Sequence, residues 1–162
     1  MPRRFALNTA LALTILFFAV SAKAQMPNPY GTPISLENAR KAAEPALAEA
    51  RKNNWTMAVA IVDTHGTLVF FEKIDNTQNG SAQLAIDKAR SAANFKRPTT
   101  AFQTALAAGG DGLRILGIAG AVPVEGGYPL VVDGKIVGAI GMSGGTSAQD
   151  DQCAKVGADT LK

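Results

Sequence analysis

The fold is decided by the stretch Tyr128-Pro-Leu-Val-Val-Asp133-Gly134-Lys-Ile-Val-Gly138-Ala-Ile-Gly141-Met-Ser143. Its Asp133-Gly134 pair lies between two runs rich in β-branched residues. This is the strongest short-range signal for a hairpin, because a two-residue type I′ turn needs positive φ at both positions. We therefore expect strand 130–132 to fold back onto strand 135–143. Both faces of the second strand are apolar or very small, which predicts a strand covered on both sides.

Helices and further strands are expected on both sides of this hairpin. After it, Gly144-Gly145 turns the chain into a terminal helix that Thr146 or Ser147 caps in capping-box spacing. Apolar periodicity and turn signals before it predict helices over 35–53, 81–95 and 100–108, and strands over 57–63, 67–72 and within 113–124. Pro45 should kink or interrupt the first helix. The two consecutive antiparallel strands argue against a doubly wound parallel sheet.

The first 24 residues have the composition of a secretory signal peptide. Arg3-Arg4 is followed by an apolar run around 11–20 and by Ala22-Lys23-Ala24, an A-x-A cleavage site. The run is short for a membrane span, so no stable membrane anchor is expected. Residues 25–34, rich in proline, should form an extended leader to one domain over 35–162. This predicts a periplasmic or secreted protein.

Removal of the signal peptide changes the charge balance. Three of the sixteen basic residues leave with it and no acidic residue does, so thirteen of each sign remain and the formal charge is zero. Nucleic-acid binding, which needs a basic field, is therefore not expected. The single cysteine, Cys153, excludes an intramolecular disulfide and is predicted to be a small buried apolar residue.

Several residues are candidates for chemistry. The stretch 141–145 matches G-x-S-x-G, but the only histidine precedes the serine, so close packing explains these glycines better than a nucleophile elbow. Free amides at this helix start are also a candidate site for a carboxylate or propionate. A basic cluster around the end of helix 81–95 is either a solvated face or a partner for ligand carboxylates; it comprises Lys88, Arg90, Lys96 and Arg97.

The only imidazole of the chain belongs to His65. It lies in a turn between two strands, where a solvent-facing role is the plain interpretation, but it is also the only conventional protein ligand for haem iron. Covalent haem attachment is excluded because no C-x-x-C-H motif is present. The hydroxyls of Thr99 and Thr100 are helix caps or weak metal ligands. No ligand set for a protein-only zinc site is found.

The order and spacing of several motifs resemble the GlcG/HbpS-like haem-binding family, which also supplies the C-terminal domain of PduO-type adenosyltransferases. The resemblance covers about 36–161 and rests on these stretches: Val62-Asp63-Thr-His65-Gly66-Thr-Leu68, Ala85-Ile-Asp87-Lys88-Ala89, Gly126-Gly127-Tyr-Pro129-Leu and Gly134-Lys-Ile-Val-Gly138-Ala-Ile-Gly141-Met-Ser143-Gly144-Gly145.

The resemblance implies a profilin-like α+β domain with a five-stranded antiparallel sheet flanked by helices. It also implies a homo-oligomer, from a dimer up to an octamer, that binds haem non-covalently in haem sensing, storage or degradation. The resemblance implies an iron-ligating threonine at Thr99 or Thr100. With His65 as the only imidazole and Lys88 and Arg97 from the basic cluster, the candidate haem-binding residues are Thr99, Thr100, His65, Lys88 and Arg97, with Thr99, Thr100 or His65 on the iron. The implied ligand-binding loop comprises Gly126, Gly127, Ser143, Gly144 and Gly145.

Two other functions stay open at this point. The chain is either an accessory protein or enzyme that binds a small hydroxy acid such as glycolate, or a structural oligomer without a small ligand. The glycolate hypothesis places the acid's carboxylate at 144–147. No catalytic residue is assigned, and weak haem-degrading activity is left open.

Overall fold

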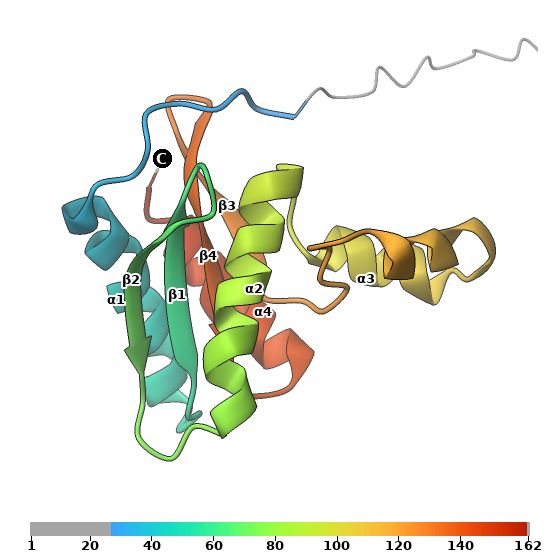
Figure 1. The fold of residues 1–162 in the computed structure, drawn as a ribbon. Helices are drawn as coiled ribbons and strands as arrows, with labels where there is room; N and C mark the ends of the chain where they lie inside the picture. Colours follow the sequence, from blue (N-terminus) through green and yellow to red (C-terminus); the bar gives the residue numbers. More distant parts are fainter. Residues whose placement is uncertain (1–26, 162) are drawn as a thin grey trace, which may run out of the picture.

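The computed structural model describes residues 27–161, so the predicted signal peptide lies outside the described residues. A four-stranded antiparallel sheet in the order β2-β1-β4-β3 forms the middle layer, with α1 and α4 on one face and α2 on the other (Figure 1). The elements are α1 (Leu36–Lys52), β1 (Ala58–Asp63), β2 (Leu68–Lys73), α2 (Asn79–Phe95), α3 (Thr100–Ala107), the 3-10 helix η1 (Gly110–Gly117), β3 (Gly127–Val132), β4 (Lys135–Ser143) and α4 (Ser147–Ala158).

The predicted hairpin is confirmed as β3 and β4. Asp133 and Gly134 have φ values of 48° and 71°, the left-handed geometry that a type I′ turn needs. Strand β4 pairs with β1 on its other side and is buried along most of its length, as its two apolar faces predicted. The hairpin therefore supplies the centre and one edge of the sheet.

The small residues of β4 let α2 approach the sheet closely. A Cβ built on Gly141 would lie 2.7 Å from the backbone nitrogen of Ala89 and would also meet the carbonyl oxygen of Ala85. Alanines of α2 and small residues of β1 and β4 fill this side of the core, whereas larger apolar residues fill the side under α1 and α4. The buried alanines of α2 thus pack directly on the sheet.

The first helix confirms its predicted start and corrects one expectation. Ser35 caps α1, and its hydroxyl accepts a hydrogen bond from the Asn38 amide at 3.2 Å. The helix then runs without interruption through Pro45, so the predicted break is wrong. Neither α1 nor any other helix in residues 27–161 has the length and apolar character needed to cross a bilayer.

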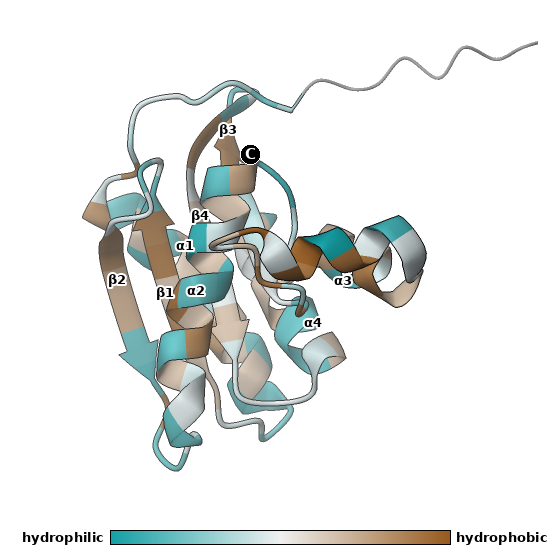
Figure 2. Cartoon of the chain, turned by 45° about the vertical axis from the view of Figure 1, so that its right-hand side comes forward, coloured by the Kyte–Doolittle hydropathy of each residue, from teal (hydrophilic) through white to brown (hydrophobic). Residues whose placement is uncertain are grey.

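The fifth strand of the prediction is wrong. The apolar run after residue 112 forms η1 and a turn instead of a strand, and together with α3 it makes an arm that projects from the sheet (Figures 1 and 2). Gly109 and Gly110 turn the chain back with positive φ, and Gly112 then packs against the Ala105 carbonyl. A short apolar run cannot be assigned to strand or helix by periodicity alone.

The leader adds a single bridge to the sheet. Tyr30 pairs in parallel with Ile136 at the start of β4, and Gly31 donates to the Ile136 carbonyl at 2.8 Å. The leader therefore crosses the end of the β3–β4 hairpin near the C-terminal end of α2 (Figure 1).

Candidate functional site

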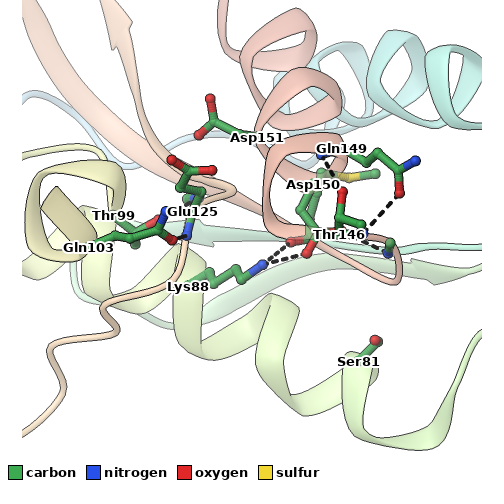
Figure 3. A network of polar contacts seen from close by, with 12 residues as sticks. Ser81, Lys88, Thr99, Gln103, Glu125, Thr146, Gln149, Asp150 and Asp151 are labelled. Carbon is green, nitrogen blue, oxygen red and sulfur yellow. Dashed lines mark hydrogen bonds and ion pairs between the residues drawn. The ribbon is translucent and has the colours of Figure 1, made fainter. Parts of the chain in front are cut away.

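A buried ion pair joins α2 to α4. The Nζ of Lys88 lies 2.7 Å from Oδ2 of Asp150 and donates to the Met142 carbonyl at 3.0 Å (Figure 3). The side chains are 0% and 4% exposed. Burial lowers the pKa of Lys88 and raises the pKa of Asp150, while the pairing opposes both shifts. Lys88 is thus enclosed and bonded to two internal acceptors in this structure, and its contact with haem stays a prediction.

Thr99 belongs to the same closed cluster. It is fully buried, its hydroxyl accepts a hydrogen bond from the Gly127 amide at 3.0 Å, and its own amide donates to the Gly127 carbonyl at 3.0 Å. A Cβ on Gly127 would lie 2.5 Å from the Lys88 carbonyl oxygen and 2.7 Å from Cγ2 of Thr99. Both residues therefore lock the start of β3 against α2, and the threonine hydroxyl is bonded inside the protein in this structure.

The backbone amides of the loop before α4 donate hydrogen bonds to side chains of α4 itself. Gly145 donates to Oδ1 of Asp150 at 3.0 Å, and Thr146 and Gln149 form the predicted capping box (Figure 3). Ser143 is buried and Gly126 packs against Asp150. An internal carboxylate therefore occupies the place predicted for a ligand carboxylate.

The other two candidate iron ligands lie elsewhere. The Thr100 hydroxyl donates to Oδ1 of Asp151 at 2.9 Å, and the Tyr128 hydroxyl donates to Oδ2 at 2.8 Å. Burial and this carboxylate raise the pKa of Tyr128 to about 12. His65 is exposed on the β1–β2 turn, which the Arg90 side chain ties to α2 through a 3.0 Å hydrogen bond to the Gly66 carbonyl.

An open pocket of about 530 Å³ lies at the C-terminal end of α2. Its walls come from the leader, the α2–α3 junction and the β3–β4 hairpin, and most of its lining residues are apolar. They are Pro27, Asn28, Lys96, Arg97, Pro98, Ala101, Pro129, Val131 and Ile136. Neither Lys96 nor Arg97 takes part in any of the ion pairs of the described residues. The site thus combines apolar walls with two cations that have no acidic partner there.

The pocket contains one of the predicted haem-binding residues. Arg97 lines it, whereas Lys88 and Thr99 lie in the closed cluster, and Thr100 and His65 are absent from the lining. Within residues 27–161, no three or more histidine, cysteine, aspartate or glutamate side chains come together in a metal-binding group. The leader was not predicted as a wall of the site, because the parallel bridge at Tyr30 has no local signal.

Cys153 is expected to be unreactive in the folded protein. It is fully buried, and burial raises the pKa of its thiol to about 12, which removes the nucleophilic thiolate at neutral pH. An Ellman's reagent assay at pH 8 should detect no free thiol in the native protein and one per chain in guanidinium. Rapid labelling without denaturant would contradict the buried position.

Residues 34–159 match the family model described as "Haem degrading protein HbpS-like". The chain belongs to the HbpS-like family. Protein GlcG of Escherichia coli K12 is 38% identical over 95 residues, which cover 59% of this chain and 69% of GlcG. An uncharacterised 15.0 kDa protein of Citrobacter freundii is 30% identical over 128 residues, covering 78% of this chain and 90% of that protein.

Solved structures of HbpS-like proteins share the fold. A crystal structure of HbpS is 31% identical with a TM-score of 0.74 and covers 82% of this chain and 92% of its own. A double mutant of HbpS from Streptomyces reticuli has a TM-score of 0.74 at 27% identity, over 96% of this chain and 99% of its own. The crystal structure of the PduOC:Heme complex is 26% identical with a TM-score of 0.72. The match covers 81% of this chain and 96% of the PduOC chain. These likenesses confirm the family and the α+β fold that the sequence predicted.

Proposed function

We propose that this protein is an exported, oligomeric haem-binding protein and that haem binds non-covalently in the pocket at the end of α2. The observation that carries the proposal is the combination of apolar walls with two cations outside any ion pair of the described residues, in a chain of the HbpS-like family. Haem is a flat apolar ring with two carboxylates on one edge. In this proposal the ring lies against the apolar walls that Pro98, Pro129 and Val131 form, and the propionates pair with Lys96 and Arg97.

Apolar burial supplies most of the affinity in this proposal. The volume of about 530 Å³ lies within the usual range of small-molecule sites, and such sites use a few charged groups to orient a mostly apolar ligand. Among the described residues that line the pocket, none is a histidine, cysteine, methionine or tyrosine, the usual protein ligands of haem iron. Strong axial coordination from the same chain is therefore not part of the proposal.

A haem titration of the mature chain, residues 25–162, followed by Soret absorbance tests the site. We expect saturable binding at a fixed ratio of haem to subunit. Arg97→Ala should weaken binding about 2- to 5-fold, because it removes one exposed charge pair with a propionate. His65→Ala should leave the affinity unchanged. Arg51→Ala is the matched control, since this arginine pairs with Glu72 outside the pocket. A flat titration of folded protein would refute haem binding.

The hydroxy-acid alternative has less support from the geometry. At the start of α4 the amide of Gly145 is bonded to Asp150 and that of Thr146 to Gln149, so the predicted carboxylate site is filled by the chain itself. Glycolate at millimolar concentration should therefore not raise the melting temperature of the protein. Stabilisation by glycolate but not by haemin would favour the hydroxy-acid function.

The projecting arm supports the oligomeric part of the proposal. Leu113 and Leu116 are 56% and 69% exposed, and Ile118 beside them is 42% exposed. Exposed apolar clusters of this kind mark protein contacts more often than free surface. Sizing by light scattering, run alongside the titration, measures the number of subunits. Export is tested by the N-terminal sequence of the protein recovered from the periplasm or the medium.

A further inference from the structure

Lys96 has an unusual backbone conformation for its residue type. It caps the C-terminal end of α2 with φ 54° and ψ 36°, a left-handed geometry that usually selects glycine. The non-glycine residues with positive φ in the described chain are Asn54, Asn76, Lys96 and Asp133. Asparagine and aspartate tolerate this region through local hydrogen bonds, but lysine has no such compensation. A strained residue at the edge of a pocket is a reason to look for a function of its side chain.

The leader holds this side chain in place. The Nζ of Lys96 lies 4.1 Å from the centre of the Tyr30 ring, within range of a cation–π contact. The Tyr30 hydroxyl donates to the Ala93 carbonyl at 2.8 Å, so the ring is fixed against the last turn of α2. Parallel pairing of the leader with β4 fixes the backbone on either side of the tyrosine, as Ile136 donates to the Pro29 carbonyl at 2.8 Å.

The same segment forms part of the pocket wall. Pro27 and Asn28 line the pocket beside Lys96 and Arg97. The family match begins at residue 34, so this wall and Tyr30 come from a segment that precedes the family domain. The leader therefore both closes one side of the site and orients one of its two cations.

We infer that Lys96 selects ligands that carry a carboxylate and that Tyr30 is the positioning residue that aims it at the pocket. The inference rests on the proposed haem site and names the residues that give this site its preference for a carboxylate-bearing ligand. In this arrangement the ammonium keeps its contact with the tyrosine ring when haem binds and pairs with one propionate at the same time. Preorganisation by the ring reduces the side-chain entropy lost on binding.

The test compares haemin with haemin whose two propionates are amidated, bound to the wild type and to Lys96→Gly. Wild type should prefer free haemin, and Lys96→Gly should reduce this preference about 2- to 5-fold by removing one cation–carboxylate contact. The loss should shrink at high salt. Because glycine relieves the left-handed strain, Lys96→Gly should melt at a temperature no lower than Lys96→Met, although both lose affinity. Lys41→Met, an exposed lysine of α1, is the control.

The role of Tyr30 is tested by a double-mutant cycle. Tyr30→Leu should weaken binding of free haemin about as much as Lys96→Gly, and the double variant should lose little more than either alone. Additive losses would show that Tyr30 acts independently of Lys96 and would overturn its positioning role. If Lys96→Gly bound free haemin and amidated haemin with the same affinities as the wild type, the inference would be overturned, but the proposed haem binding would not. A wild-type chain that binds neither haemin would remove the proposed function and this inference together.

Discussion

Lys88→Met is expected to lower the free energy of unfolding by about 3–5 kcal/mol, the usual cost of leaving one partner of a buried ion pair uncompensated. The remaining Asp150 carboxylate is 4% exposed and lies 2.7 Å from the ammonium that the substitution removes. Burial already raises the pKa of this carboxyl, so it should take up a proton in the variant. Urea unfolding followed by circular dichroism measures the change.

Two controls separate charge burial from packing. Lys88→Met with Asp150→Leu removes both charges and should recover part of the stability, because no buried charge is left alone. Lys155→Met breaks an exposed pair with Asp159 and should stay within about 1 kcal/mol of the wild type. If Lys88→Met behaves like Lys155→Met, the ion pair does not hold α2 and α4 together as described.

Gly141→Ala is expected to destabilise the protein by about 3 kcal/mol, at the upper end of overpacking effects, because its new methyl group meets backbone atoms of α2. The Cβ would lie 2.7 Å from the Ala89 nitrogen, and a helix backbone has no flexible end that could move aside. The unfolding midpoint in urea should fall with an unchanged slope.

Gly80→Ala is the matched control for this change. Gly80 lies in the first turn of the same helix, and a Cβ at this position would have no neighbouring atom within 4 Å. The substitution should therefore be neutral or stabilise the protein by up to about 1 kcal/mol. Equal midpoints for the two variants would contradict the close contact between α2 and β4.

Local signals predicted most of the fold. The Asp133-Gly134 turn, the helix start near residue 35 and the Thr146 capping box each depend on neighbours within a few residues, and all are present. The strand predicted within 113–124 is wrong because the segment forms an arm outside the sheet, on which Leu113, Leu116 and Ile118 are exposed. Apolar composition alone does not distinguish a residue that packs in its own sheet from one left at the surface.

The candidate site was harder to predict, because it depends on contacts between distant parts of the chain. Lys88 and Asp150 are 62 positions apart, and no local sequence pattern shows that they form an ion pair in the folded protein. The pocket is assembled from the leader, the end of α2 and the β3–β4 hairpin, so its lining depends on tertiary packing. Arg97 was predicted as a site residue because basic residues cluster near that helix end. Tyr30 was not predicted, since the residues that it contacts, Ala93 and Lys96, lie more than 60 positions along the chain.

The most direct test of the proposed haem site is hydrogen exchange of the chain 25–162 with and without haemin, measured by mass spectrometry of peptides. We expect slower exchange on haemin binding in peptides that cover 96–101 and 129–136, where the pocket lies. The turn that carries His65 and the loop 144–147 should exchange at the same rate in both samples. Protection centred on either of those two segments, with none at the end of α2, would contradict the proposed haem site.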